Sequence, residues 1–100
     1  MTPVTVINKI QVKPGKMDEL LELQQKFAAT LPSNVLVGRR MYRSLDGTAA
    51  VLVSTFRSQS AQAEMLQHPD FKAHVERLRP LVESSSPMLY EEAYATGDYR

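Results

Sequence analysis

The fold is decided by one stretch, residues 55–82, which reads TFRSQSAQAEMLQHPDFKAHVERLRPLV. Its second half carries an apolar stripe at helical spacing, formed by Phe71, Val75, Leu78 and Val82. His74 and Leu81 flank this stripe, so His74 is expected at the edge of the core rather than in open water. Pro69 stands where a helix can begin, because the first helical N–H has no partner to lose.

A shorter helix is expected before Pro69. Ser58 or Ser60 can cap it, and it runs through Met65 and Leu66. The stretch therefore predicts two helical pieces with a break at residues 68–70, and both histidines of the protein lie in it. A sheet-forming half precedes this unit, and one strand follows it.

The first strand is predicted over residues 4–12, where apolar and polar residues alternate. Asn8 is the exception, because it places a polar side chain on the apolar face. A buried amide without hydrogen-bond partners costs roughly 1–3 kcal/mol. Asn8 is therefore expected either to bond a neighbouring backbone group or to point into a ligand pocket.

The other elements follow from breaks in the pattern. Residues 13–16 end the first strand, and a helix with an apolar stripe is expected over 17–31. The second strand is predicted over 35–44 and the third over 50–57, joined by a hairpin turn at Asp46-Gly47. Residues 84–87 read as a linker, 88–95 as the fourth strand and 96–100 as a polar tail.

This order, β-α-β-β-α-β with the second helix broken, predicts an α+β ferredoxin-like fold for one domain over residues 1–100. Its four strands would form an antiparallel sheet with the helices on one face. The other face would be bare and would carry apolar side chains, which predicts a homodimer formed through the sheet face.

Composition excludes several classes of function. The chain has no cysteine, which excludes disulfides, thiolate catalysis and cysteine-ligated metals. The net charge is +1 and the charges are interspersed, so no nucleic-acid partner is expected. No signal-like start or membrane-spanning run is seen, which predicts a cytoplasmic protein with no membrane partner.

The candidate site residues come mainly from the helical stretch. His74 is a candidate base at a pocket edge, since its unperturbed pKa is near 6.5, or else a partly buried residue bonded to a carbonyl. His68 either lines the pocket or faces solvent at a helix end. The remaining candidates would line a pocket or pack in the core: Tyr42, Phe56, Met65, Phe71, Leu78 and Tyr90. No metal-ligand cluster is expected.

The chain resembles the antibiotic biosynthesis monooxygenase family, whose members adopt a dimeric α/β-barrel version of the ferredoxin-like fold. The resemblance covers nearly the whole chain and rests on the order and spacing of four segments: INKIQVKPGKMDEL (residues 7–20), STFRSQSAQAEML (54–66), HPDFKAHVERLRPLV (68–82) and MLYEEAY (88–94). It implies a cofactor-independent monooxygenase that oxidises an aromatic or quinol-like small molecule with dioxygen. For this reaction Asn8 and His74, found from the strand and helix patterns, are the candidate catalytic residues.

The resemblance leaves two alternatives. One is a haem-binding or haem-degrading relative: Asn8 matches the Asn of that subgroup, but Met65 stands where its Trp is expected and Val75 where its haem-ligating His is expected. The other is a non-catalytic small-molecule-binding or stress-response dimer.

Overall fold

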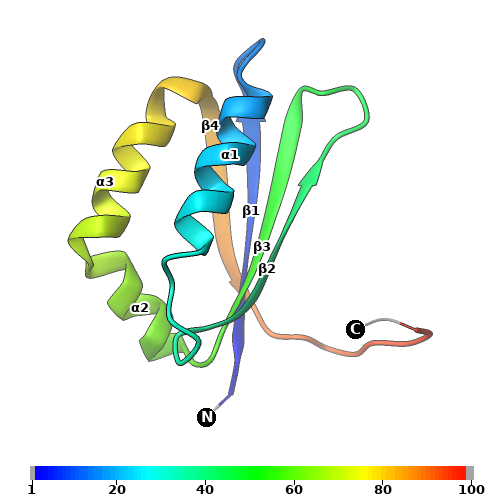
Figure 1. Cartoon of the computed structure of the whole chain (residues 1–100). Coiled ribbons are helices and arrows are strands. Elements are labelled where there is room, and N and C mark those ends of the chain that lie inside the picture. Colours follow the sequence, from blue (N-terminus) through cyan, green and yellow to red (C-terminus); the bar gives the residue numbers. More distant parts are fainter. Residues whose placement is uncertain (1, 99–100) are drawn as a thin grey trace.

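The computed structural model describes residues 2–98 (Figure 1). The elements follow one another as β1 (Val4–Val12), α1 (Met17–Ala28), β2 (Leu36–Arg43), β3 (Ala49–Phe56), α2 (Gln59–Gln67), α3 (Pro69–Leu78), a 3₁₀ turn (Arg79–Leu81) and β4 (Val82–Tyr90).

The four strands form one antiparallel sheet in the order β2-β3-β1-β4. The helices α1, α2 and α3 all cover the same face of this sheet (Figure 1). This arrangement is the predicted α+β ferredoxin-like fold, which the structure confirms. The apolar core lies between the sheet and the helices, and it is built from Ile10, Val12, Leu20, Ala50 and Leu81.

The helical unit begins and breaks at the predicted residues. The Ser58 hydroxyl oxygen accepts a hydrogen bond from the Ala61 N–H at 3.1 Å and so caps α2. His68 ends α2, and its ring nitrogen Nδ1 accepts a hydrogen bond from the Asp70 N–H at 3.1 Å. Pro69 is the first residue of α3. One histidine thus links the two helices.

Strand β2 contains a bulge that decides which face each of its side chains takes. Leu36 lies opposite Phe56 on β3, whereas Gly38 lies opposite Thr55, so Val37 is an extra residue without a partner. An extra residue reverses the alternation of every side chain that follows it. Consequently Arg39, opposite Ser54, lies on the helix-covered face.

The predicted bounds of the fourth strand, residues 88–95, were wrong. Strand β4 begins at Val82, and the predicted linker Ser84–Pro87 lies inside it. The serines can pair with β1 because the hydrogen bonds between the two strands are made by backbone groups and not by side chains. Pro87 is tolerated because β4 is an edge strand. The strand ends at Tyr90, which lies opposite Thr5, one residue inside the start of β1.

Two helix ends also differ from the prediction. Helix α1 stops at Ala28 rather than at Leu31, and the Thr30 hydroxyl donates to the Phe27 carbonyl oxygen at 2.7 Å just after its end. Val82 does not belong to the helical stripe. Helix α3 ends at Leu78 and Pro80 lies in the 3₁₀ turn, so Val82 is already extended. Of the predicted tail, residues 99–100 lie outside the described residues.

The outer face of the sheet, which no described helix covers, carries an apolar row. Ile7 on β1 lies opposite Val53 on one side and opposite Met88 on the other. Met88 is 56% exposed. Within residues 2–98, no helix is long and apolar enough to cross a membrane.

Candidate active site

A cavity of about 440 Å³ lies between the sheet and the helices. This size is within the range of small-molecule sites. Most of its lining is apolar and includes Val6, Phe27, Leu31, Leu52, Phe56, Met65, Leu66, Phe71 and Val75. The polar residues of the lining are Asn8, Arg39, Ser54, Gln62 and Ser85. We refer to this space as the main cavity.

A second hollow of about 410 Å³ adjoins the main cavity. Asn8, Arg39 and Phe71 line both spaces. The second hollow adds Gln24, His74 and Leu78, and it also includes the exposed residue Glu83 in its lining. The two spaces therefore meet at the polar groups of β1 and β2.

Arg39 is held by neutral partners. Its Nε donates to the Ser54 hydroxyl oxygen at 3.1 Å, and its Nη2 donates to Gln24 Oε1 at 3.1 Å. The Phe27 ring lies 6.0 Å from the guanidinium carbon. The third nitrogen, Nη1, is buried and has no hydrogen-bond partner among residues 2–98. Burial lowers the pKa of Arg39 to about 10, so the side chain is cationic at neutral pH.

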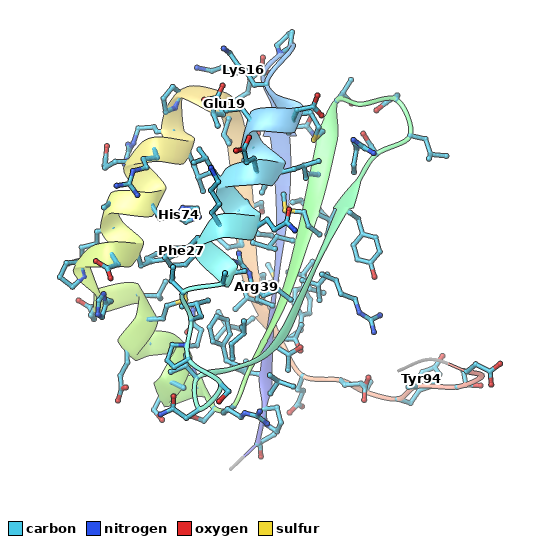
Figure 2. All side chains as sticks on the ribbon, viewed as in Figure 1. Lys16, Glu19, Phe27, Arg39, His74 and Tyr94 are labelled. Carbon is cyan, nitrogen blue, oxygen red and sulfur yellow. The ribbon has the colours of Figure 1, made fainter. Side chains whose placement is uncertain are left out.

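His74 is joined to Arg39 through Gln24, and Figure 2 shows Arg39, Phe27 and His74 gathered between the sheet, α1 and α3. His74 Nε2 lies 3.1 Å from Gln24 Oε1. An arginine N–H can only donate, so the Gln24 atom facing Arg39 must be the amide oxygen. That oxygen can only accept, so Nε2 of His74 must carry the proton. The His74 ring also stacks on Phe27, with centroids 4.1 Å apart.

His74 is more deeply buried than the sequence predicted, with 4% of its surface exposed. Burial, followed by the charges of Arg39 and Arg77, lowers the pKa of His74 from 6.5 to about 4. The ring is therefore neutral at neutral pH. Its Nε2 is a donor to Gln24 and cannot accept a proton from a substrate at the same time.

This low pKa predicts a pH-dependent stability. Between about pH 6.5 and pH 4 the unfolded chain binds a proton at His74 and the folded chain does not, so stability falls as pH falls. Because one pKa unit corresponds to about 1.4 kcal/mol, the loss across this window is roughly 3 kcal/mol. The His74→Gln variant keeps an N–H donor but has no group that titrates at this position. Its free energy of unfolding should therefore fall less than that of the wild type over the same pH range.

Denaturant unfolding of both proteins at one protein concentration, in steps from about pH 7 to pH 4.5, measures this difference. The depressed pKa of Asp46, caused mainly by its hydrogen bond with Ser44, acts equally in both proteins and cancels. Parallel stability curves would contradict the buried neutral state of His74.

Asn8 lies on the helix-covered face, as its strand parity predicted. Its Oδ1 accepts a hydrogen bond from the Ser86 N–H on β4 at 3.1 Å. A backbone N–H can only donate, so the orientation of the amide is determined and its Nδ2 carries the remaining donors. Asn8 also lines both cavities. Asn8 therefore has a backbone partner and also borders a cavity.

The structure brings some of the predicted pocket residues together and separates others. Phe56, Met65 and Phe71 line the main cavity, and Leu78 lines the adjoining hollow. His68 lines neither of these spaces. It caps α3, and it borders a separate hollow of about 210 Å³ near Met65 and Phe71.

Tyr42 and Tyr90 lie on the other side of the sheet. Tyr42 is opposite Val51 and Tyr90 is opposite Thr5, and both pairs belong to the outer face. The two side chains are 49% and 43% exposed, respectively. Neither residue lines the main cavity or the adjoining hollow. Their assignment to the pocket within one chain is therefore wrong.

The polar residues of the site that were not predicted include Gln24, Gln62 and Arg39. Gln24 lies four residues after Leu20 and three before Phe27, so it interrupts the apolar stripe of α1 in the way that Asn8 interrupts β1. That interruption could have identified it. Gln62 is buried on α2 with 6% of its surface exposed. Arg39 depends on the bulge in β2, for which we see no clear signal in the sequence.

The side chains do not fit a haem bound as the resemblance would require. Val75, at the position of the expected ligating histidine, lines the main cavity but has no donor atom. His74, on α3, points inward and contacts Gln24. Its Nε2 carries a proton in that contact and so cannot ligate a metal. Across residues 2–98, no group of three His, Asp or Glu side chains is placed to hold a metal ion.

Comparisons with known proteins agree with this architecture. Solved structures with the same fold include SnoaB from Streptomyces nogalater, described as a cofactor-independent oxygenase, with 24% identity, a TM-score of 0.79 and coverage of 99% of this chain and 100% of that one. Rv0793 from Mycobacterium tuberculosis has 20% identity, a TM-score of 0.81 and coverage of 96% and 100%. PA3566 from Pseudomonas aeruginosa has 17% identity, a TM-score of 0.77 and coverage of 94% and 97%.

These identities are low enough that the solved structures show a shared fold alone. A search of curated proteins found no match. The model of the antibiotic biosynthesis monooxygenase family matches residues 3–77, which is most of the chain. The chain therefore belongs to the antibiotic biosynthesis monooxygenase family.

Proposed function

We propose that this protein is a cofactor-independent monooxygenase that oxidises a phenolic or quinol-like aromatic with dioxygen. The observation that carries the proposal is the main cavity, in which apolar walls surround the amide donors of Asn8. Membership of a monooxygenase family supports the reaction class. An aromatic ring fits apolar walls, and N–H groups in a site with little water stabilise a developing oxyanion.

The proposed reaction needs no electron donor other than the substrate. A phenolate gives one electron to dioxygen, and the resulting radical pair combines to form a C–O bond at a ring carbon that carries hydrogen. Protonation gives a hydroperoxide. Loss of the proton from that carbon then breaks the O–O bond, releasing water and leaving a quinone. One phenol and one dioxygen thus yield one quinone and one water.

Each side chain then has a defined role. Phe27, Phe56 and Phe71 hold the ring and limit the entry of water. Nδ2 of Asn8 donates to the peroxide oxygen, while its Oδ1 is held by Ser86. His74 is a positioning residue, because it does not line the main cavity and its low pKa makes it a weak base. In this form of the proposal it does not act as the base.

We also propose that the protein works as a homodimer through the outer sheet face. The row of Val53, Ile7 and Met88 crosses three strands of this face. Tyr42 and Tyr90 add to the same face and are each more than one third exposed. Apolar patches of this kind on a small protein mark association sites.

Oxygen consumption with 1-naphthol as substrate, in the presence of a metal chelator, tests the reaction. We expect one dioxygen consumed per naphthoquinone formed and, under ¹⁸O₂, one labelled oxygen in the product. The control substrate is 2,4-dimethyl-1-naphthol, in which methyl groups block both ring carbons that could become a carbonyl, C2 and C4. Saturable binding of 1-naphthol without oxygen consumption would contradict the enzymatic proposal and favour a non-catalytic binding protein.

A further inference from the structure

We propose that Arg39 makes this site selective for the ionised form of its aromatic ligand, with the ligand's phenolate oxygen bound at Nη1. This inference rests on the proposed function for the class of ligand and adds the charge state in which the ligand binds. It also assigns that state to one residue of β2.

The hydrogen bonds of Arg39 orient the guanidinium without neutralising it. Nε and Nη2 are committed to Ser54 and Gln24, both of which are neutral. Among residues 2–98, no carboxylate forms an ion pair with Arg39. Buried cations are normally paired, because an unpaired one costs several kcal/mol. The positive charge under the helices therefore lacks an anionic partner within the described chain.

The unpaired nitrogen belongs to a side chain that borders both cavities. Arg39 lines both the main cavity and the adjoining hollow, together with Asn8 and the apolar side chain of Leu52. Nη1 carries two N–H groups and has no partner among residues 2–98. An anionic oxygen would give it short, charge-assisted hydrogen bonds, which are stronger than bonds between neutral groups.

The surroundings of Arg39 keep this nitrogen in place. Gln24 receives hydrogen bonds from both Arg39 and His74, and the His74 ring stacks on Phe27. Phe27 in turn lies against the guanidinium. These contacts restrain the guanidinium group of Arg39 from two sides. Nη1 is then the nitrogen whose N–H groups are available to a ligand. A restrained donor loses less entropy when it binds a ligand.

The lining of the main cavity explains why the ligand would bind already ionised. Among the described residues that line it, none is an aspartate, glutamate, histidine or lysine. No side chain there can readily take a phenolic proton at neutral pH. A fixed cation instead favours the phenolate over the neutral phenol, and so lowers the pKa of the bound phenol. The phenolate is also the form that gives an electron to dioxygen.

Anaerobic binding of 1-naphthol measures this preference without any turnover. The absorbance of bound ligand is followed from about pH 6 to pH 9, a range in which Arg39 stays mostly protonated. We expect the pKa of bound 1-naphthol to be at least one unit below that of free 1-naphthol, which is about a tenfold preference for the anion. Arg39→Met should remove this shift, and Arg39→Lys should retain part of it.

Arg43→Met is the matched control. Arg43 lies on the same strand and the same face, but it is exposed beside Asp18 and lines neither cavity. The Arg43→Met variant removes the same charge as Arg39→Met, and it should leave the pKa of bound 1-naphthol as low as in wild type. The thermal midpoint of Arg39→Met should be equal to or above that of wild type, because replacing an incompletely paired buried charge is often neutral or stabilising. A purely structural arginine would give a lower midpoint.

The outcomes separate this inference from the proposed function. An Arg39-dependent pKa shift supports the inference even if no oxygen is consumed. A shift that is absent in wild type, or unchanged in Arg39→Met, overturns it even if oxygen consumption is observed. Tighter Arg39-dependent binding of 1-naphthoate than of 1-naphtholate would overturn the phenolate assignment in favour of a carboxylate. If Arg39→Met does not fold, the wild-type shift and its reduction in Arg39→Lys decide the question.

Discussion

Replacing Val53 with aspartate is expected to dissociate the proposed homodimer into folded monomers. Val53 lies at one end of the apolar row on the outer sheet face, with Ile7 on one neighbouring strand and Arg40 on the other. A carboxylate buried at this position loses its hydration, which costs several kcal/mol that the adjacent Arg40 offsets only in part, and a two-fold interface would contain the substitution twice. The dimer dissociation constant should therefore rise by at least about 100-fold.

Light scattering at micromolar concentration gives the mass of each variant, and circular dichroism checks that the fold is retained. Val51 lies on the same face, so Val51→Asp should behave alike. The control is Leu45→Asp in the hairpin turn, where the side chain is fully exposed and outside the sheet. A wild-type protein that is monomeric under these conditions would refute the proposed interface.

Asn8→Ala is expected to lower turnover by roughly 10²–10³-fold, the usual effect of removing one donor from an oxyanion site. The variant also loses the bond between Oδ1 and the Ser86 N–H, which should reduce stability by about 1 kcal/mol. Turnover must therefore be expressed per folded molecule, by single-turnover measurement under conditions in which unfolding is negligible.

Two further variants locate the cause of this effect. Asn8→Asp keeps an oxygen to accept from Ser86 but replaces the donor with an acceptor, so it should lose turnover as well. Asn34→Ala removes an exposed loop amide and should change neither turnover nor stability. If Asn8→Ala is less stable but equally active once folded, Asn8 has a structural role alone.

Much of the fold could be predicted because local signals and tertiary packing agree. The alternation of residues 4–12, the cap at Ser58 and the helix start at Pro69 each act within a few residues of chain. Strand β4 was misplaced because its serines carry no signal of their own. They are extended because β1 lies beside them, and this pairing is invisible in a local pattern.

The site was less predictable for a similar reason. Asn8 could be found because a polar residue interrupted an alternating strand. Arg39 could not, because its face depends on the unpaired residue Val37 rather than on parity counted along β2. His74 was found as a residue, but its protonation depends on Gln24 and Arg39, which come from two other elements.

The bulge at Val37 also affects how this chain should be aligned with distant relatives. Arg39 and Arg40 are adjacent and chemically identical, yet they lie on opposite faces of the sheet. At identities of 17–24%, a gap placed one position away would equate the wrong arginine with a residue of another protein. Equivalent positions in β2 are therefore best assigned through the partner residue on β3, with Ser54 marking the inward-facing arginine.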